Sequence, residues 1–134
     1  MDVTEVTVCD TGTPYRVRIS DGAHQWHADE PVAVGGGDSA PTPMHLLCAS
    51  LGACTTITLR MYAARKQWPL ESIEVRVTMN PAGKPDDGTT VLAREIHLRG
   101  ALEEGQRERL LQIANACPTH KILSGNIRID SALI

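Results

Sequence analysis

The sequence predicts an α+β fold in which one long interior helix packs on a mostly antiparallel sheet. Residues 43–66 can form a single uninterrupted helix. The segments in which apolar and polar residues alternate are grouped before and after this helix instead of alternating with further helices. Grouped strands favour antiparallel pairing, because parallel strands need a crossover between them. We expect the order βββαββαβ, in a single domain over residues 1–134.

Three short strands are expected before the long helix. Residues 3–9 and 15–19 have strand-like patterns, and turn-forming residues follow each of them. Residues 23–28 would then be the third strand of a meander. The segment 29–43 is rich in glycine and proline and is expected to be a loop. Its run of three glycines lacks the Lys-Ser/Thr pair of a phosphate-binding loop.

The long helix has clear start and stop signals. Thr42 is a suitable N-cap, and Pro43 is tolerated at the first helical position because its missing N–H needs no partner there. The helix should end near Trp68, which precedes a proline. Residues 39–59 include no Asp, Glu, Lys or Arg, which indicates an interior helix. One sheet covers only one side of it, so we expect the same helix of a second copy to cover another side in a twofold homodimer.

Four further elements and a short helical turn are expected after the long helix. Residues 73–79 alternate cleanly and predict a strand, and residues 91–99 predict a second strand with a weaker pattern. Residues 102–116 have an amphipathic helical pattern. A short helical turn should begin at the Cys-Pro pair and run over residues 117–123. Residues 126–131 alternate again and predict a closing strand.

Composition excludes several classes of function. The chain has no Phe, only 3% aromatic residues and a net charge of −3, so it lacks both the stacking rings and the basic surface of a nucleic-acid-binding protein. No signal peptide is visible, and prolines and polar residues interrupt the uncharged stretch, so we expect a cytoplasmic protein without membrane contact. In that compartment, four irregularly spaced cysteines are more often free, catalytic or metal-binding than a disulfide framework. The usual ligand spacings are missing, so we expect no metal and no cofactor.

Two cysteines and two histidines are the candidate site residues. Cys54, in the middle of the long helix, is either a small core residue or a thiol that needs a nearby donor to react. Cys117 either ends the apolar face of the preceding helix or caps the short turn, where free N–H groups favour a thiolate. His120 could pair with Cys117 as a base or be a solvated loop residue. His45 is a base or donor near the reactive helix, or a cap residue. The remaining cysteines, Cys9 and Cys48, are expected to be structural.

Several of these residues lie in a pattern that resembles the OsmC/Ohr family. The pattern comprises Gly52-Ala53-Cys54-Thr55 in the long helix and Cys117-Pro118 after the second helix, within a resemblance that runs from about Trp26 to the end. The resemblance implies an intertwined homodimer and a thiol-dependent peroxidase acting on organic hydroperoxides or hydrogen peroxide. It also implies that Cys54 is the attacking thiolate and Cys117 the resolving thiol. The cycle would pass through a sulfenic acid and a disulfide, which a dithiol donor reduces.

The sequence departs from this family at two activating positions. The resemblance implies a glutamate just after the helix-opening proline and an arginine from the preceding loop. Here the helix opens Pro43-Met44-His45, and residues 19–59 include neither Lys nor Arg. Replacement could come from Arg16, Arg18, Lys121 or a residue of a partner chain. Two alternatives to a peroxidase therefore stand: a non-catalytic binder of a small apolar or thiol-reactive ligand, and a redox sensor whose disulfide changes a surface for a protein partner.

Overall fold

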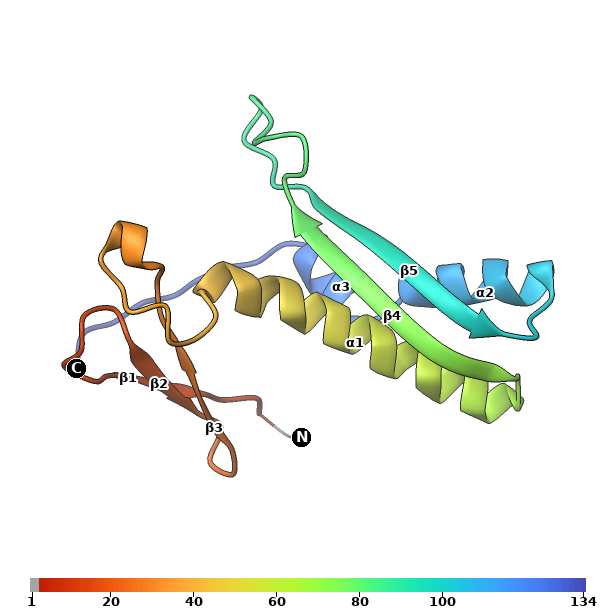
Figure 1. The fold of residues 1–134 in the computed structure, drawn as a ribbon, viewed down its shortest axis with the longest axis horizontal. Coiled ribbons are helices and arrows are strands. Elements are labelled where there is room, and N and C mark those ends of the chain that lie inside the picture. The colour runs from red at the N-terminus through yellow and green to blue at the C-terminus, as the bar shows by residue number, and fades with distance from the viewer. Residues whose placement is uncertain (1–2) are drawn as a thin grey trace. The chain divides into compact units, whose positions relative to one another are not determined.

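The computed structural model describes residues 3–134 of the chain (Figure 1). The chain forms two compact units, divided between Leu47 and Cys48. The boundary lies inside helix α1 (Pro43–Lys66), whose first turn belongs to the first unit. The single domain over residues 1–134 stays a prediction.

The first unit contains the predicted three-stranded meander. Strands β1 (Thr7–Asp10), β2 (Val17–Ser20) and β3 (Gln25–Ala28) pair antiparallel in the order β1-β2-β3. Each strand is shorter than its predicted segment, because hydrogen-bonded pairing between the strands extends over only four residues of each. The β2–β3 turn is closed by Asp21, whose Oδ1 accepts from the N–H of His24 at 2.6 Å.

A buried carboxylate organises the loop between β3 and α1. Asp29 is 1% exposed, and its two oxygens accept hydrogen bonds from the N–H groups of Glu30, Gly37 and Ser39 and from the Ser39 hydroxyl. The Ser39 hydroxyl contributes most to lowering the pKa of this carboxyl to about 2. The loop includes a short 3-10 helix, η1 (Val32–Val34). Only glycine fits at position 36, since a Cβ there would lie 2.0 Å from the Glu30 carbonyl oxygen.

Helix α1 has the predicted bounds and presents one side to the core. Its buried residues recur every four positions and are Leu51, Thr55, Leu59 and Ala63. On the opposite side Ile57 and Met61 are 58% and 57% exposed. The helix has the length and mean hydropathy, 1.3, of a membrane span. Those two properties are shared by core helices of globular proteins, and Leu59 and Ala63 of α1 lie in a core.

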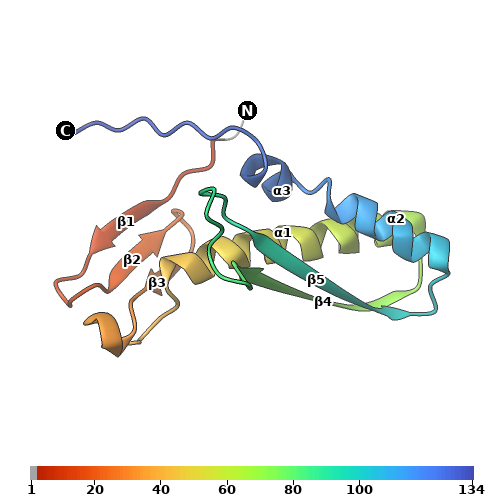
Figure 2. The ribbon, with the colours of Figure 1, turned by 90° about the horizontal axis from the view of Figure 1, so that it is seen from above.

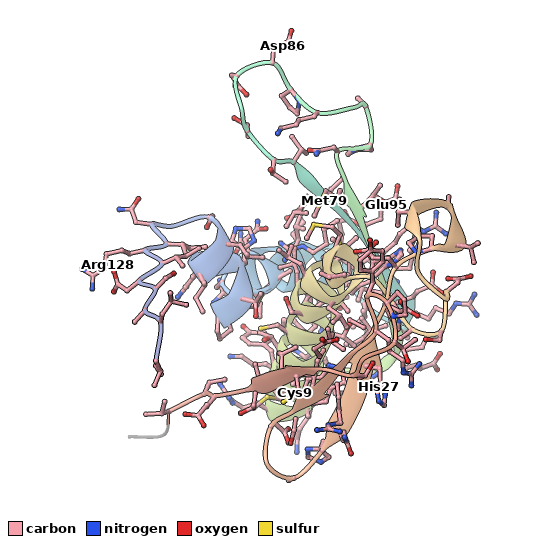
Figure 3. The ribbon with its side chains drawn as sticks, turned by 90° about the vertical axis from the view of Figure 1, so that its left-hand side faces the viewer. Cys9, His27, Met79, Asp86, Glu95 and Arg128 are labelled. Atoms are coloured by element: carbon pink, nitrogen blue, oxygen red, sulfur yellow. The ribbon has the colours of Figure 1, made fainter. Side chains whose placement is uncertain are left out.

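The second unit packs α1 on a two-stranded antiparallel sheet and a second helix. Strands β4 (Leu70–Met79) and β5 (Leu92–Gly100) form the sheet, and α2 (Glu104–Ala114) follows. The core that joins these elements consists of Leu59, Ala63, Leu70, Leu110 and Ala114. Figures 1 and 2 show the β4–β5 ribbon running along α1, with α2 beside the last turns of α1. The loop that joins β4 to β5, with Asp86 at its tip, extends away from the strands (Figure 3).

The predicted second helix and short turn are both confirmed, and the closing strand is wrong. Helix α2 is shorter than predicted because Glu103 caps it in a reciprocal pair with Gln106. Helix α3 (Pro118–Leu123) forms at the Cys-Pro pair. The segment 126–131 is an extended tail in which Ile129 is 83% exposed (Figure 3). Alternation alone does not make a strand: the backbone groups need a partner strand, and none of the described strands pairs with this segment.

Candidate functional site

The structure brings Cys54 and Cys117 together, although they are far apart in sequence. Cys54 lies in the middle of α1, and Cys117 is the N-cap of α3. Pro118 occupies the first position of α3, so the next two N–H groups have no partner within the helix. One of them, from Thr119, donates to Cys54 Sγ at 3.5 Å, and the other, from His120, donates to Cys117 Sγ at 3.4 Å. The start of α3 therefore donates one N–H to each of the two sulfurs, and neither cysteine is in a disulfide.

Neutral donors favour the thiolate of Cys54. Burial raises the pKa of this thiol, but hydrogen bonds outweigh that effect, and the net pKa is lowered from the ordinary value. The donors are the hydroxyl and N–H of Thr119, the Cys117 thiol and the Thr58 hydroxyl. The side chain is half-buried, so it keeps some access to solvent. A lowered pKa and partial access to solvent are properties that reactive cysteines share.

The Cys117 thiol is shielded from solvent by the surrounding side chains. Its side chain is 0% exposed. The Oγ1 of Thr55 lies 3.8 Å from Cys117 Sγ and donates its own proton to the Leu51 carbonyl at 2.7 Å. The single proton of the Cys117 thiol therefore has two acceptors in reach, the Thr55 oxygen and Cys54 Sγ.

Arg94 supplies a positive charge next to Thr55, the neighbour of Cys117. From β5 its guanidinium donates to Thr55 Oγ1 at 3.0 Å, to Asn115 Oδ1 at 2.9 Å and to His120 Nδ1 at 3.1 Å. A guanidinium cannot accept a hydrogen bond, so Nδ1 of His120 must be the acceptor, and a neutral His120 has its proton on Nε2. One side chain thus links β5 to α1, to the end of α2 and to α3.

Arg94 is absent from the sequence-based candidates, although the sequence holds a signal for it. It is in phase with Leu92, Ile96 and Leu98 on the half-buried face of β5. An arginine in that register interrupts the apolar alternation, which is why residues 91–99 have the weaker strand pattern. A charged residue on the inward face of a strand is costly unless it is paired, so it indicates a specific role. Within the second unit, Arg94 is the cation that bonds to Thr55, the hydroxyl neighbour of Cys117.

The two candidate histidines have different surroundings. His120 lies at the thiols, held through its N–H by Cys117 and through Nδ1 by Arg94. His45 is at the start of α1, where its N–H donates to Thr42 Oγ1 at 3.2 Å and its Nδ1 accepts from the Thr42 N–H at 3.3 Å. This is a capping box with histidine in the place of glutamate. His45 is nine residues before Cys54, about 13 Å along the helix axis.

A small apolar cavity adjoins the arginine network. Its volume is about 210 Å³. It is lined by Leu51, Thr90, Leu92, His120, Leu123 and Ser124. His120 is shared between this cavity and the Arg94 contacts, so a molecule bound in the cavity would lie next to the thiol site.

Comparison with known proteins identifies the family. The family model described as OsmC-like protein matches residues 35–132. The chain belongs to the OsmC-like family. The family resemblance predicted from the two cysteine motifs is thereby confirmed. No protein with a curated description matches this OsmC-like sequence.

Solved structures confirm the α+β OsmC-like fold. An OsmC-like protein from Mycoplasma pneumoniae has a TM-score of 0.76 at 19% identity, over 92% of this chain and 89% of that one. An organic hydroperoxide resistance protein OsmC from Legionella pneumophila has a TM-score of 0.67 at 25% identity, over 94% and 92%. The organic hydroperoxide resistance protein OhrB of Bacillus subtilis has a TM-score of 0.62 at 22% identity, over 93% of each chain.

Proposed function

We propose that this OsmC-like protein is a thiol-dependent peroxidase that reduces organic hydroperoxides. The observation that carries the proposal is the contact between two free thiols, of which the accessible one, Cys54, has a lowered pKa. Two structural relatives are named for organic hydroperoxide resistance, which supports the choice of substrate class. Cys54 is the attacking residue because Cys117 is fully buried.

The cycle needs no cofactor. The Cys54 thiolate attacks the terminal oxygen of the hydroperoxide, the O–O bond breaks, and the alkoxide leaves and takes up a proton as the alcohol. Cys54 is then a sulfenic acid. Cys117 attacks its sulfur and releases water, which forms the Cys54–Cys117 disulfide. A dithiol reductant restores both thiols, so the cycle belongs in a reducing compartment such as the cytoplasm.

Peptide mapping after peroxide treatment tests this cycle. One equivalent of cumene hydroperoxide added to the reduced protein should produce a Cys54–Cys117 disulfide. Cys54→Ser should abolish peroxide consumption, and Cys117→Ser should leave a Cys54 sulfenic acid that dimedone traps. Cys48→Ser on the same helix is the matched control and should leave the rate within about twofold of the wild type. Consumption that survives Cys54→Ser would show that the thiol pair is not the site.

The same proposal includes a homodimer. Ile57 and Met61 expose apolar surface on α1, and Ile127 and Ile129 do so on the tail. Scattered apolar residues are common on surfaces, but a row of them on one helix side favours burial against another chain. One chain has a mass of 14.5 kDa, and light scattering coupled to gel filtration should give twice that value. Ile57→Glu should shift the protein toward the monomer, and a wild-type monomer would contradict the dimer.

The cavity favours a second candidate, a non-catalytic binder of a small apolar ligand. Leu51, Leu92 and Leu123 give it an apolar lining, and His120 and Ser124 add polar groups. In that case an apolar compound should raise the melting temperature of the wild type, and Leu123→Trp, which fills the cavity, should remove the shift. A thermal shift without peroxide consumption would favour this candidate over the peroxidase.

A further inference from the structure

The two sulfurs of the site differ in accessibility, which matters for how a disulfide between them is opened. Cys117 is 0% exposed, whereas Cys54 is only half-buried. A thiol–disulfide exchange reaction requires that the incoming thiolate reach one of the two sulfurs, and its rate depends on which sulfur is accessible. Access therefore selects Cys54 Sγ as the sulfur that a reductant attacks.

The surroundings of Cys117 suit the sulfur that is displaced. A displaced sulfur leaves as a thiolate, and exchange is faster when that thiolate is stabilised. The His120 N–H lies 3.4 Å from Cys117 Sγ and already donates to it. The Thr55 hydroxyl, at 3.8 Å, donates to the Leu51 carbonyl while Cys117 is a thiol. Rotation of that hydroxyl about its C–O bond would direct its proton to Cys117 Sγ once the sulfur becomes negative.

Arg94 makes the Thr55 hydroxyl a stronger donor. Its guanidinium donates to Thr55 Oγ1 at 3.0 Å. A cation that is hydrogen-bonded to a hydroxyl oxygen increases the polarity of the O–H bond. Asn115 and His120 hold the other nitrogen of the guanidinium, so the charge stays in place while sulfur chemistry proceeds. The donors to Cys54, in contrast, are neutral hydroxyl, amide and thiol groups. The charge thus acts on the side of Cys117.

We infer that reduction of the disulfide has a fixed direction, in which a reductant thiolate attacks Cys54 Sγ and Cys117 leaves as a thiolate received by Thr55 and Arg94. The inference rests on the proposed function, because it needs the Cys54–Cys117 disulfide. The reductant sulfur bonds to Cys54 as the protein S–S bond breaks, and the electron pair passes to Cys117. The second thiolate of a small dithiol then displaces Cys54. The reductant becomes a cyclic disulfide, and its two protons end on the two cysteines.

Trapping the mixed disulfide tests the direction of attack. The Cys9→Ser, Cys48→Ser double variant keeps only the two cysteines of the site. Diamide forms the disulfide, a brief pulse of 2-mercaptoethanol opens it, and acid followed by N-ethylmaleimide stops the reaction before peptide mapping. We expect mercaptoethanol on Cys54 and maleimide on Cys117. The reverse pattern, or an equal mixture, overturns the inference even if the peroxidase cycle is correct. If neither diamide nor peroxide forms the disulfide, the proposed function fails, and the inference fails with it.

Two matched pairs of variants test the roles of Thr55 and Arg94, which act here as positioning residues. Thr55→Val and Arg94→Met should slow reduction of the disulfide by dithiothreitol by about three- to tenfold, because each weakens the donor to the leaving sulfur. Thr55→Ser keeps the hydroxyl and should stay within about twofold of the wild type. Arg94→Lys keeps the charge but loses the fork that holds Asn115 and His120, so its rate should lie between those of the wild type and Arg94→Met. A general loss of structure would slow the peroxide step equally. Equal slowing of both steps, or no rescue by Ser and Lys, would overturn the assignment.

Discussion

Removal of the Thr119 hydroxyl is the change that tests the activation of Cys54 most directly. Its side-chain hydrogen bond is the largest of the contributions that lower the pKa of Cys54. Thr119→Val removes the hydroxyl at nearly constant volume, and it keeps the N–H that donates to Cys54 Sγ at 3.5 Å. Thr119→Ser keeps both donors and is the matched control. We expect Val, but not Ser, to raise the pKa of Cys54.

The size of the effect follows from the hydrogen bond that is lost. A hydrogen bond to a charged group stabilises it by about 1.5–3 kcal/mol, and partial exposure of Cys54 reduces this to about 1 kcal/mol. At pH values well below the pKa, the thiolate population then falls about fivefold. The remaining thiolate is more basic and therefore more nucleophilic, with a Brønsted coefficient of about 0.4–0.5, so the net rate falls only about two- to threefold. Above both pKa values the thiolate is fully formed, and Thr119→Val should react about twofold faster than the wild type.

The predicted signature is a pair of crossing pH–rate profiles. The assay is the rate of attack on 4,4′-dithiodipyridine in the background without Cys9 and Cys48, followed by absorbance from pH 5 to pH 10. Thr119→Ser should follow the wild-type profile. Parallel profiles, with Thr119→Val slower at every pH, would show that the hydroxyl acts on packing and not on the ionisation of Cys54. That result would refute the reasoning.

Three further predictions concern stability and the loop before α1. Leu110→Ala should destabilise the protein by about 3–4 kcal/mol in urea unfolding, because Leu110 is 0% exposed in the core. Leu111→Ala, at the neighbouring position that is 56% exposed, should cost less than about 1 kcal/mol. Similar losses for the two variants would contradict the core assignment. The Asp29 carboxylate, with its pKa lowered from 3.8 to about 2, contributes stability that is fully present above pH 3.8 and is lost as pH falls through about 2. Asp29→Asn should therefore flatten the dependence of the urea midpoint on pH below about 4, and an unchanged slope would contradict the role of this carboxylate. Gly36→Ala should lower the melting temperature more than Gly105→Ala, since a Cβ at position 36 would meet the Glu30 carbonyl oxygen at 2.0 Å while a Cβ at position 105 would meet nothing within 4 Å; equal shifts would count against the close approach.

The parts of the fold that could be predicted are those with local signals. Thr42 and Pro43 mark the start of α1, and the observed helix has the predicted bounds, Pro43–Lys66. Pro118 likewise marks Cys117 as a cap, which the structure confirms. In both cases the feature that fixes the helix start, a set of backbone N–H groups without partners in the helix, involves only the first four residues.

The parts that could not be predicted depend on contacts between distant residues. The Thr119 N–H that donates to Cys54 lies 65 residues away in sequence, so the spacing gives no information about it. The sequence alone does not assign Arg94 to the site, because a charged side chain at an inward strand position only weakens the apolar alternation, and its partners Thr55, Asn115 and His120 are distant in sequence. The predicted closing strand is wrong, because the alternation of apolar and polar residues at 126–131 shows which side chains would share a face but supplies no partner strand for the backbone.

The origin of the charge in this site has a consequence for how the protein can vary. Cys54, Cys117, Thr119 and Arg94 all belong to residues 48–134. The arginine that reaches the thiol network comes from β5, not from the segment before α1. The two thiols of the proposed cycle and the donors described around them are therefore encoded in one continuous stretch of the chain. The proposal therefore predicts that a chimera with residues 1–47 from another OsmC-like protein still forms the Cys54–Cys117 disulfide when it is treated with peroxide.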